Sequence, residues 1–142
     1  MPRDPHIKVS GFKIWIHSYQ YPNVSEYWDA NWLNVTAQCE ANSAKVSASG
    51  SIIHTSEIER WLEQLILLNS SLEGFAGLEC MEPELNVNIH AQKTGTMEMV
   101  VNITPDTLSQ EHRFTFEIDQ SFLPELILNC KNSLKEFPVR FK

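Results

Sequence analysis

The sequence has no apolar run long enough to cross a membrane and no fingerprint of a common enzyme class. A membrane helix needs about 20 consecutive apolar residues, whereas the longest run here is Leu65–Leu68, inside an amphipathic segment. The opening residues MPRDPHIKVS lack the apolar stretch of a signal peptide, so we expect a cytoplasmic protein. The motifs of P-loop, dinucleotide-binding, zinc-peptidase and serine-hydrolase proteins do not occur.

Cysteine is also scarce, with three residues in 142. Cys39, Cys80 and Cys130 are odd in number and widely spaced, which argues against a disulfide framework. Cys39 and Cys130 fall on predicted apolar faces, whereas Cys80 follows Glu79, whose carboxylate raises a thiol pKa and disfavours a nucleophile. The five histidines are scattered singly and are predicted to be surface or hydrogen-bonded polar residues. We therefore predict no enzyme activity, cofactor or metal.

Basic residues are few and unevenly distributed. Eleven Lys and Arg against 18 Asp and Glu give a net charge of −7, and residues 14–92 hold two bases against ten acids. Because binding to nucleic-acid phosphates depends on clustered Lys and Arg, we expect no direct nucleic-acid contact. An acidic surface steers association with a basic protein, although it can also serve only to keep a protein soluble.

Alternation of apolar and polar residues dominates the chain and predicts β-strands. It is clearest in residues 85–91 and 97–103, which flank a hairpin turn at Lys93–Gly95. Five further strands are predicted at residues 12–19, 33–39, 44–52, 75–80 and 114–118.

Two segments change to helical periodicity. Ser56 followed by Glu59 predicts a capping box, after which apolar residues recur at helical spacing as far as Ile66. The second helix begins near Ser121 and is stopped by Pro138.

The predicted order is βββαββββα. Strands joined by hairpin-length turns favour antiparallel pairing, with helices covering the apolar side of the sheet. We therefore predict one α+β domain over residues 1–142, with a mainly antiparallel sheet of about six to seven strands and two amphipathic helices packed on it.

Two groups of side chains are candidates for a surface role. Carboxylates gather at Glu79, Glu82 and Glu84, with Glu73 nearby, and could hold a metal, form a solvated turn or face another protein. They lack the Asp-rich, glycine-centred loop of a calcium site. The second group is aromatic and either fills the core or anchors an interface: Trp15, Tyr19, Tyr21, Tyr27, Trp28 and Trp32.

Several segments occur in a recognisable order across residues 10–138. They are YQYP, YWDANWLNV, SEIERWLEQL, GFAGLECMEPELNVNI, RFTFEIDQSFLPELI and a closing EFP. This layout resembles the WapI-like immunity proteins, which neutralise the C-terminal toxin domains of contact-dependent systems. The resemblance implies a cytoplasmic inhibitor that binds a cognate toxin, often a nuclease, and needs no cofactor.

We therefore expect a monomeric immunity protein that binds a basic toxin domain through an acidic surface. The expected contacts are Glu26, Trp28, Asp29, Glu73, Glu79, Glu82 and Glu84. One alternative is an acidic secretion chaperone or adaptor that grips an extended effector segment and commonly dimerises. Another is an enzyme or small-ligand binder, which would need a concave pocket with convergent polar groups.

Overall fold

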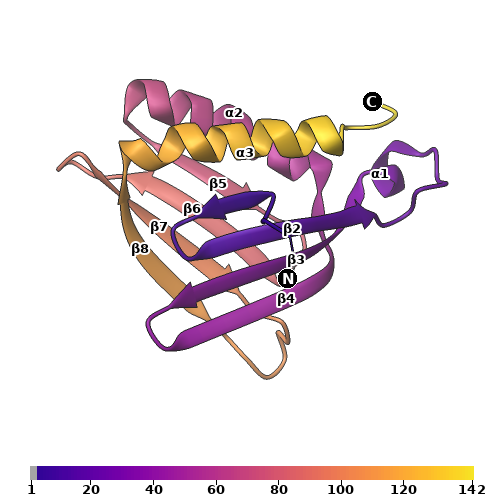
Figure 1. Ribbon diagram of the computed structural model, residues 1–142, viewed down its shortest axis with the longest axis horizontal. Coiled ribbons are helices and arrows are strands. Elements are labelled where there is room, and N and C mark those ends of the chain that lie inside the picture. The colour runs from indigo at the N-terminus through magenta and orange to yellow at the C-terminus, as the bar shows by residue number, and fades with distance from the viewer. Residues whose placement is uncertain (1–2) are drawn as a thin grey trace.

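The computed structural model describes residues 3–142 as two four-stranded antiparallel sheets that share one core, with two long helices along one side (Figure 1). Strand order in each sheet follows chain order, so each sheet is a meander of hairpins. The first sheet contains β1 (Ile7–Val9), β2 (Phe12–Tyr19), β3 (Trp32–Ala41) and β4 (Ala44–His54). The second contains β5 (Phe75–Glu79), β6 (Leu85–Ala91), β7 (Thr96–Ile103) and β8 (Arg113–Asp119).

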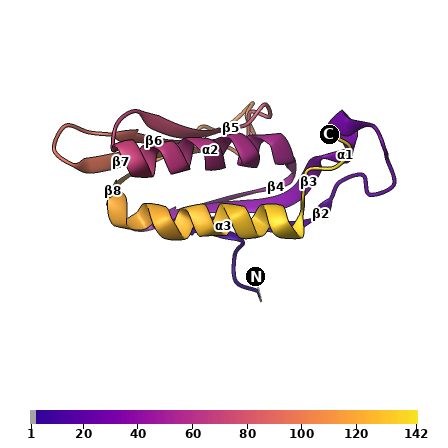
Figure 2. The ribbon, with the colours of Figure 1, turned by 90° about the horizontal axis from the view of Figure 1, so that it is seen from above.

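The helices connect the sheets and cover two of their edges. The short α1 (Tyr27–Ala30) lies between β2 and β3, and α2 (Thr55–Ser71) joins the two sheets. A 3-10 turn, η1 (Gln120–Phe122), leads from β8 into α3 (Leu123–Glu136). The two long helices pack side by side (Figure 2). The α2 helix lies along the edge strand β5, and α3 lies along the edge strand β1.

The core lies between the sheets and beneath the helices. Leu85, Val87 and Ile89 of β6 are buried, as period-two alternation predicts, and Trp61 is the largest fully buried side chain, contributed by α2. Cys39 and Cys130 are buried in the same cluster, which confirms their predicted placement. Burial raises the pKa of both thiols to about 12.

The prediction of one sheet with six to seven strands is wrong in detail. All seven predicted strands are present, but with the additional β1 they divide four and four. Alternation and hairpin spacing identify which consecutive strands pair, but they do not show that α2 carries the chain from the edge of one sheet to the edge of another. The α1 helix was also missed, because four residues are too few to show a helical period.

The start of α2 differs from its prediction as well. His54, rather than Ser56, is the N-cap, and its capping partner is Glu57 rather than Glu59. His54 Nδ1 accepts a hydrogen bond from the Ser56 N–H at 3.3 Å, and the Glu57 carboxylate accepts one from the His54 N–H at 2.8 Å. The sequence rule for an N-cap recognises Ser, Thr, Asp or Asn, so it did not identify a histidine in that position.

The turn between β1 and β2 requires glycine at position 11. A Cβ there would lie 2.0 Å from the Glu40 carbonyl oxygen and 3.1 Å from the Phe116 ring. We expect Gly11→Ala to lower the free energy of unfolding by about 1–3 kcal/mol, because the turn must move away from β3. Urea unfolding measures the effect; the exposed Ser10→Ala in the same turn serves as control, and equal midpoints for the two variants would contradict the prediction.

Candidate functional site

A hollow of about 390 Å³ lies beside α1, and we name it the Trp28 hollow. Its lining comes from the segment around α1, from β3 and β4 and from the turn between β5 and β6. Segments far apart in the sequence therefore meet at one surface. The lining residues are Tyr21, Trp28, Asp29, Trp32, Ser51, Met81 and Glu82.

The aromatic wall of the Trp28 hollow is built on the buried His54. The Trp28 ring stacks on the imidazole with centroids 4.5 Å apart, and Trp32 meets Trp28 edge-on at 5.6 Å. Because His54 Nδ1 accepts from the Ser56 N–H, Nε2 carries the proton and donates to the Trp28 carbonyl oxygen at 2.9 Å. Trp32 is 8% exposed and belongs to the core, whereas Trp28 is 39% exposed and presents one face to solvent.

Glu26 supports this wall from outside the hollow. Its carboxylate caps α1 by accepting hydrogen bonds from the Trp28 N–H at 3.0 Å and the Asp29 N–H at 3.1 Å. These two bonds hold the pKa of Glu26 below its ordinary value. Glu26 therefore fixes the direction of Trp28 and Asp29, while the Asp29 side chain stays exposed in the hollow.

The chain around α1 is held by the C-terminal tail. The Arg140 guanidinium donates to the carbonyl oxygens of Ala30 at 3.0 Å, and of Pro22 and Tyr21 at 3.2 Å each. Its carbon also lies 3.7 Å from the centre of the Tyr19 ring, in a cation–π contact. One side chain thus holds several loop carbonyls that would otherwise need water.

Asn31 completes this attachment from within the fold. Its side chain is fully buried; Nδ2 donates to the carbonyl oxygens of Tyr27 and Arg140 at 2.8 Å each. Its Oδ1 accepts from the Arg140 N–H at 2.8 Å. The buried amide is therefore satisfied only when the tail lies against the end of α1.

The opposite wall of the hollow is positioned by a buried carboxylate. Glu57 is 6% exposed; one oxygen accepts from the Met81 N–H at 2.7 Å and the other from the His54 N–H at 2.8 Å. Burial raises the pKa of Glu57, and the two hydrogen bonds oppose that shift. The start of α2 is thereby joined to the turn that carries Met81 and Glu82.

Carboxylates also surround Cys80. Burial is the main cause that raises its pKa, and the charges of Glu57, Glu82 and Glu84 raise it further. The predicted direction is confirmed, but these three carboxylates act in place of the predicted neighbour Glu79. Across residues 3–142, nothing donates a hydrogen bond to the buried Oε1 of Glu84.

The remaining predicted contacts lie elsewhere. Glu73 is exposed in the loop after α2, beside a separate hollow that includes Lys93. Glu79 is exposed at the end of β5, with its side chain near Gly77. The structure therefore brings together Trp28, Asp29 and Glu82, with Glu26 behind them. Sequence reasoning missed Ser51, Met81 and the supporting pair His54 and Glu57, none of which stands in a recognisable motif.

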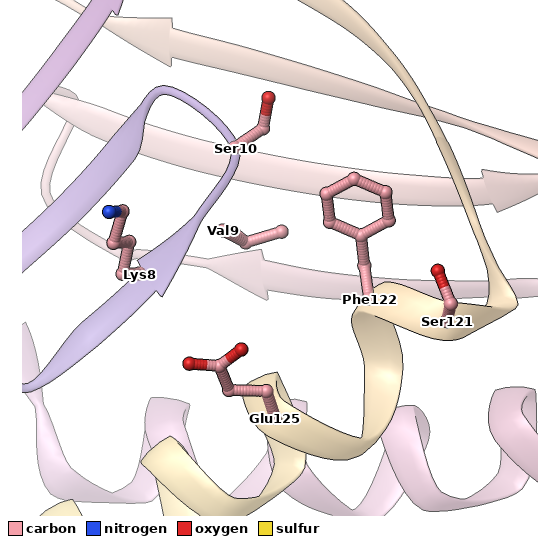
Figure 3. A pocket seen from close by; sticks show the side chains of 6 residues that line it. All are labelled: Lys8, Val9, Ser10, Ser121, Phe122 and Glu125. Carbon is pink, nitrogen blue, oxygen red and sulfur yellow. The ribbon is translucent and has the colours of Figure 1, made fainter.

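A second hollow, of about 400 Å³, lies between the β1–β2 turn and the start of α3 (Figure 3). Val9 and Phe122 lie across from each other, and Lys8 and Glu125 bring one charge of each sign. This lining contains neither the histidine nor the cysteine that most acid–base or nucleophilic chemistry uses. In residues 3–142, no group of three or more His, Cys, Asp or Glu could hold a metal ion, and no helix is long and apolar enough to span a membrane.

Exposed tryptophan side chains are common in the surfaces through which proteins contact one another. The chain belongs to the WapI-like immunity protein family, whose pattern it matches over residues 6–138. The resemblance in the order of its segments is thereby confirmed. Searches of curated proteins and of solved structures gave no match.

The buried carboxylate makes stability dependent on pH. Because the pKa of Glu57 is raised in the folded state, the free energy of unfolding falls as pH rises from the ordinary glutamate value through the raised one. Glu57→Gln should remove this dependence and cost about 1–3 kcal/mol at neutral pH, because an amide oxygen can serve only one of the two N–H groups. Urea unfolding across pH tests this. Glu63→Gln, an exposed change on the same helix, is the control, and an unchanged pH profile in Glu57→Gln would contradict it.

Removal of the Arg140 side chain should loosen the α1 segment. We expect Arg140→Ala to lower the free energy of unfolding by about 2 kcal/mol and to expose residues 20–31 to protease, because several carbonyls lose a charged donor. Arg140→Lys should have a free energy of unfolding and a cleavage rate between those of the wild type and Arg140→Ala, since an ammonium group cannot reproduce the planar guanidinium fork. Limited proteolysis with mass spectrometry measures the change, and equal cleavage rates in all three proteins would contradict it.

Proposed function

We propose that this WapI-like immunity protein binds a cognate bacterial toxin domain and holds it inactive with the surface around the Trp28 hollow. The observation that carries the proposal is the convergence of Trp28, Asp29 and Glu82 from two distant segments onto one exposed surface. Large aromatic residues beside charged groups are typical anchors of protein interfaces. Tyr21, which is 45% exposed, extends the aromatic surface.

The proposed partner is a basic domain, and a nuclease fits best. A nuclease must carry Lys and Arg to hold phosphates, and this chain has a net charge of −7, with only two of its 11 Lys and Arg in residues 14–92. The two carboxylates of the hollow would attract such a surface and speed association, while Trp28 would supply buried area once contact forms. Covering the phosphate-binding surface is then sufficient to stop the toxin.

The proposed mechanism needs neither a catalytic step nor a cofactor from this protein. We place it in the cytoplasm, where a toxin that attacks nucleic acid would act, and as a monomer in a 1:1 complex. The hollow is held on one side by Arg140 and Asn31 and on the other by Glu57. A surface ordered before binding loses less conformational entropy when the toxin docks.

Charge reversal at the hollow tests the proposal. The partner is the C-terminal domain of the toxin encoded next to this protein, and binding is measured by calorimetry at two salt concentrations. We expect Asp29→Lys and Glu82→Lys each to weaken binding by about tenfold and to reduce its salt dependence. Trp28→Ala should weaken binding by about tenfold or more at both salt concentrations, because it removes buried area rather than charge.

Glu117→Lys is the matched control, because it makes the same change in net charge on β8, away from α1 (Figure 1). It should bind within about twofold of the wild type. Neutralisation is measured in parallel as growth of cells that express the toxin domain. An equal loss in the control would show that only net charge matters, and no binding by the wild type would refute the proposed function.

A further inference from the structure

The four sheet edges of this protein are not equally protected. The helices α3 and α2 run along β1 and β5. At β4 and β8, no further strand within residues 3–142 hydrogen-bonds to the sheet. Figure 1 shows β4 as the lower edge of the nearer sheet. An unpaired edge offers a row of free N–H and C=O groups to any extended chain that reaches it.

The register of the first sheet shows which groups of β4 point outward. The Glu40 N–H donates to the Gly11 carbonyl oxygen at 3.0 Å, so Glu40 directs its hydrogen-bonding groups toward β2 and not toward its β4 partner, Lys45. These directions alternate along an antiparallel pair. The residues that direct N–H and C=O away from β3 are therefore Lys45, Ser47, Ser49 and Ser51.

These outward groups have no backbone partner within residues 3–142. None of the backbone hydrogen bonds outside the sheet ladders begins or ends on residues 44–53. The register with β3 is continuous from Ala44 to Ser51 and shifts only beyond it. The free edge is thus regular from Ala44 to Ser49, and Gly50, with a φ of +136°, distorts it just before Ser51.

The two open edges differ in the features that normally prevent pairing. Natural edges carry charges, proline or bulges. β8 carries three charged residues in seven: Arg113, Glu117 and Asp119. Residues 44–51 of β4 carry Lys45 as their one charge, no proline, and small serines on the exposed face. The distortion of β4 at Gly50 lies near the end of this stretch, so residues 44–49 of β4 retain an edge suited to strand addition, whereas β8 does not.

We propose that the toxin domain adds an extended strand to the outer edge of β4, and this proposal rests on the function proposed above. Ser51 joins the two surfaces, because it is the last outward residue of the edge and also lines the Trp28 hollow. In a toxin strand that pairs with β4, the residues just beyond the one beside Ser51 would therefore lie near Asp29 and Glu82. Main-chain pairing would supply affinity, and the hollow would select a basic or aromatic side chain.

Charge favours the toxin over a second copy of this chain as the occupant. Two copies would each bring a net charge of −7 and the same acidic hollow to the end of the edge. Like charges held close to each other oppose such an interface. A basic partner would place its cations at those carboxylates.

Proline substitution tests the edge without altering the side-chain surface of the hollow. Ser49→Pro removes an outward N–H that takes no part in the pairing with β3, so the sheet should remain folded. Ser49→Ala controls for the hydroxyl, which lies 2.9 Å from Thr36 Oγ1. The Ile103 N–H donates to the His112 carbonyl oxygen, so by the same alternation Thr115→Pro removes an outward N–H from β8 and is the matched control.

We expect Ser49→Pro to weaken binding to the toxin domain by about tenfold or more, with both controls within about twofold of the wild type. In hydrogen exchange of the complex, the amides of Lys45, Ser47, Ser49 and Ser51 should become protected. Wild-type affinity in a folded Ser49→Pro, as measured by circular dichroism and urea unfolding, would overturn the strand-addition proposal and leave the proposed function intact.

Two other results would overturn the proposal differently. A wild-type protein that does not bind the toxin domain would refute both this proposal and the function on which it rests. A dimer in sedimentation that Ser49→Pro converts to a monomer would assign the β4 edge to self-association instead.

Discussion

The Glu57 carboxylate is the interaction on which the candidate site most depends. It lies at the first turn of α2, and its two oxygens receive backbone N–H groups from His54 at the end of the first sheet and from Met81 just after β5 of the second sheet. A buried charge is tolerated only where hydrogen bonds offset its lost hydration. The two sheet ends and the helix are therefore tied to one geometry, and the walls of the Trp28 hollow follow from it.

The rest of the hollow is held by contacts that are equally remote in sequence. His54 carries the Trp28 ring on one side, and Arg140 and Asn31 attach the α1 segment to the C-terminal tail. The exposed residues are thus a small set placed on a rigid support. This arrangement suits an inhibitor in the WapI-like immunity family, because affinity depends on how little order must be gained when the partner docks.

Several features of the fold and site were predictable from local sequence. Alternation placed all seven predicted strands, and the apolar stripes placed α2 and α3. The order of segments identified the family. Trp28, Asp29 and Glu82 were among the predicted contacts, and the structure places them at one hollow, although no sequence feature showed that they meet. The division into two sheets, the strand β1 and the cap formed by His54 were missed, because each is decided by contacts across the chain or by a residue outside the usual capping rules.

By itself, the sequence determined all the elements except β1, α1 and the 3-10 turn η1, together with the amphipathic faces, the acidic balance and the family. The elements and their amphipathic faces depend on residue type and on spacings of two to four residues, so they can be predicted from local sequence. Only the tertiary structure decided which strand edges stay open and which carboxylates share a surface. Glu79 and Glu84 both stand within three residues of Glu82 in the sequence, yet Asp29 is the acid that joins Glu82 in the hollow. The pairing of Asp29 with Glu82 results from the long-range packing of the two sheets and from the attachment of α1 to the C-terminal tail, and no local pattern encodes it.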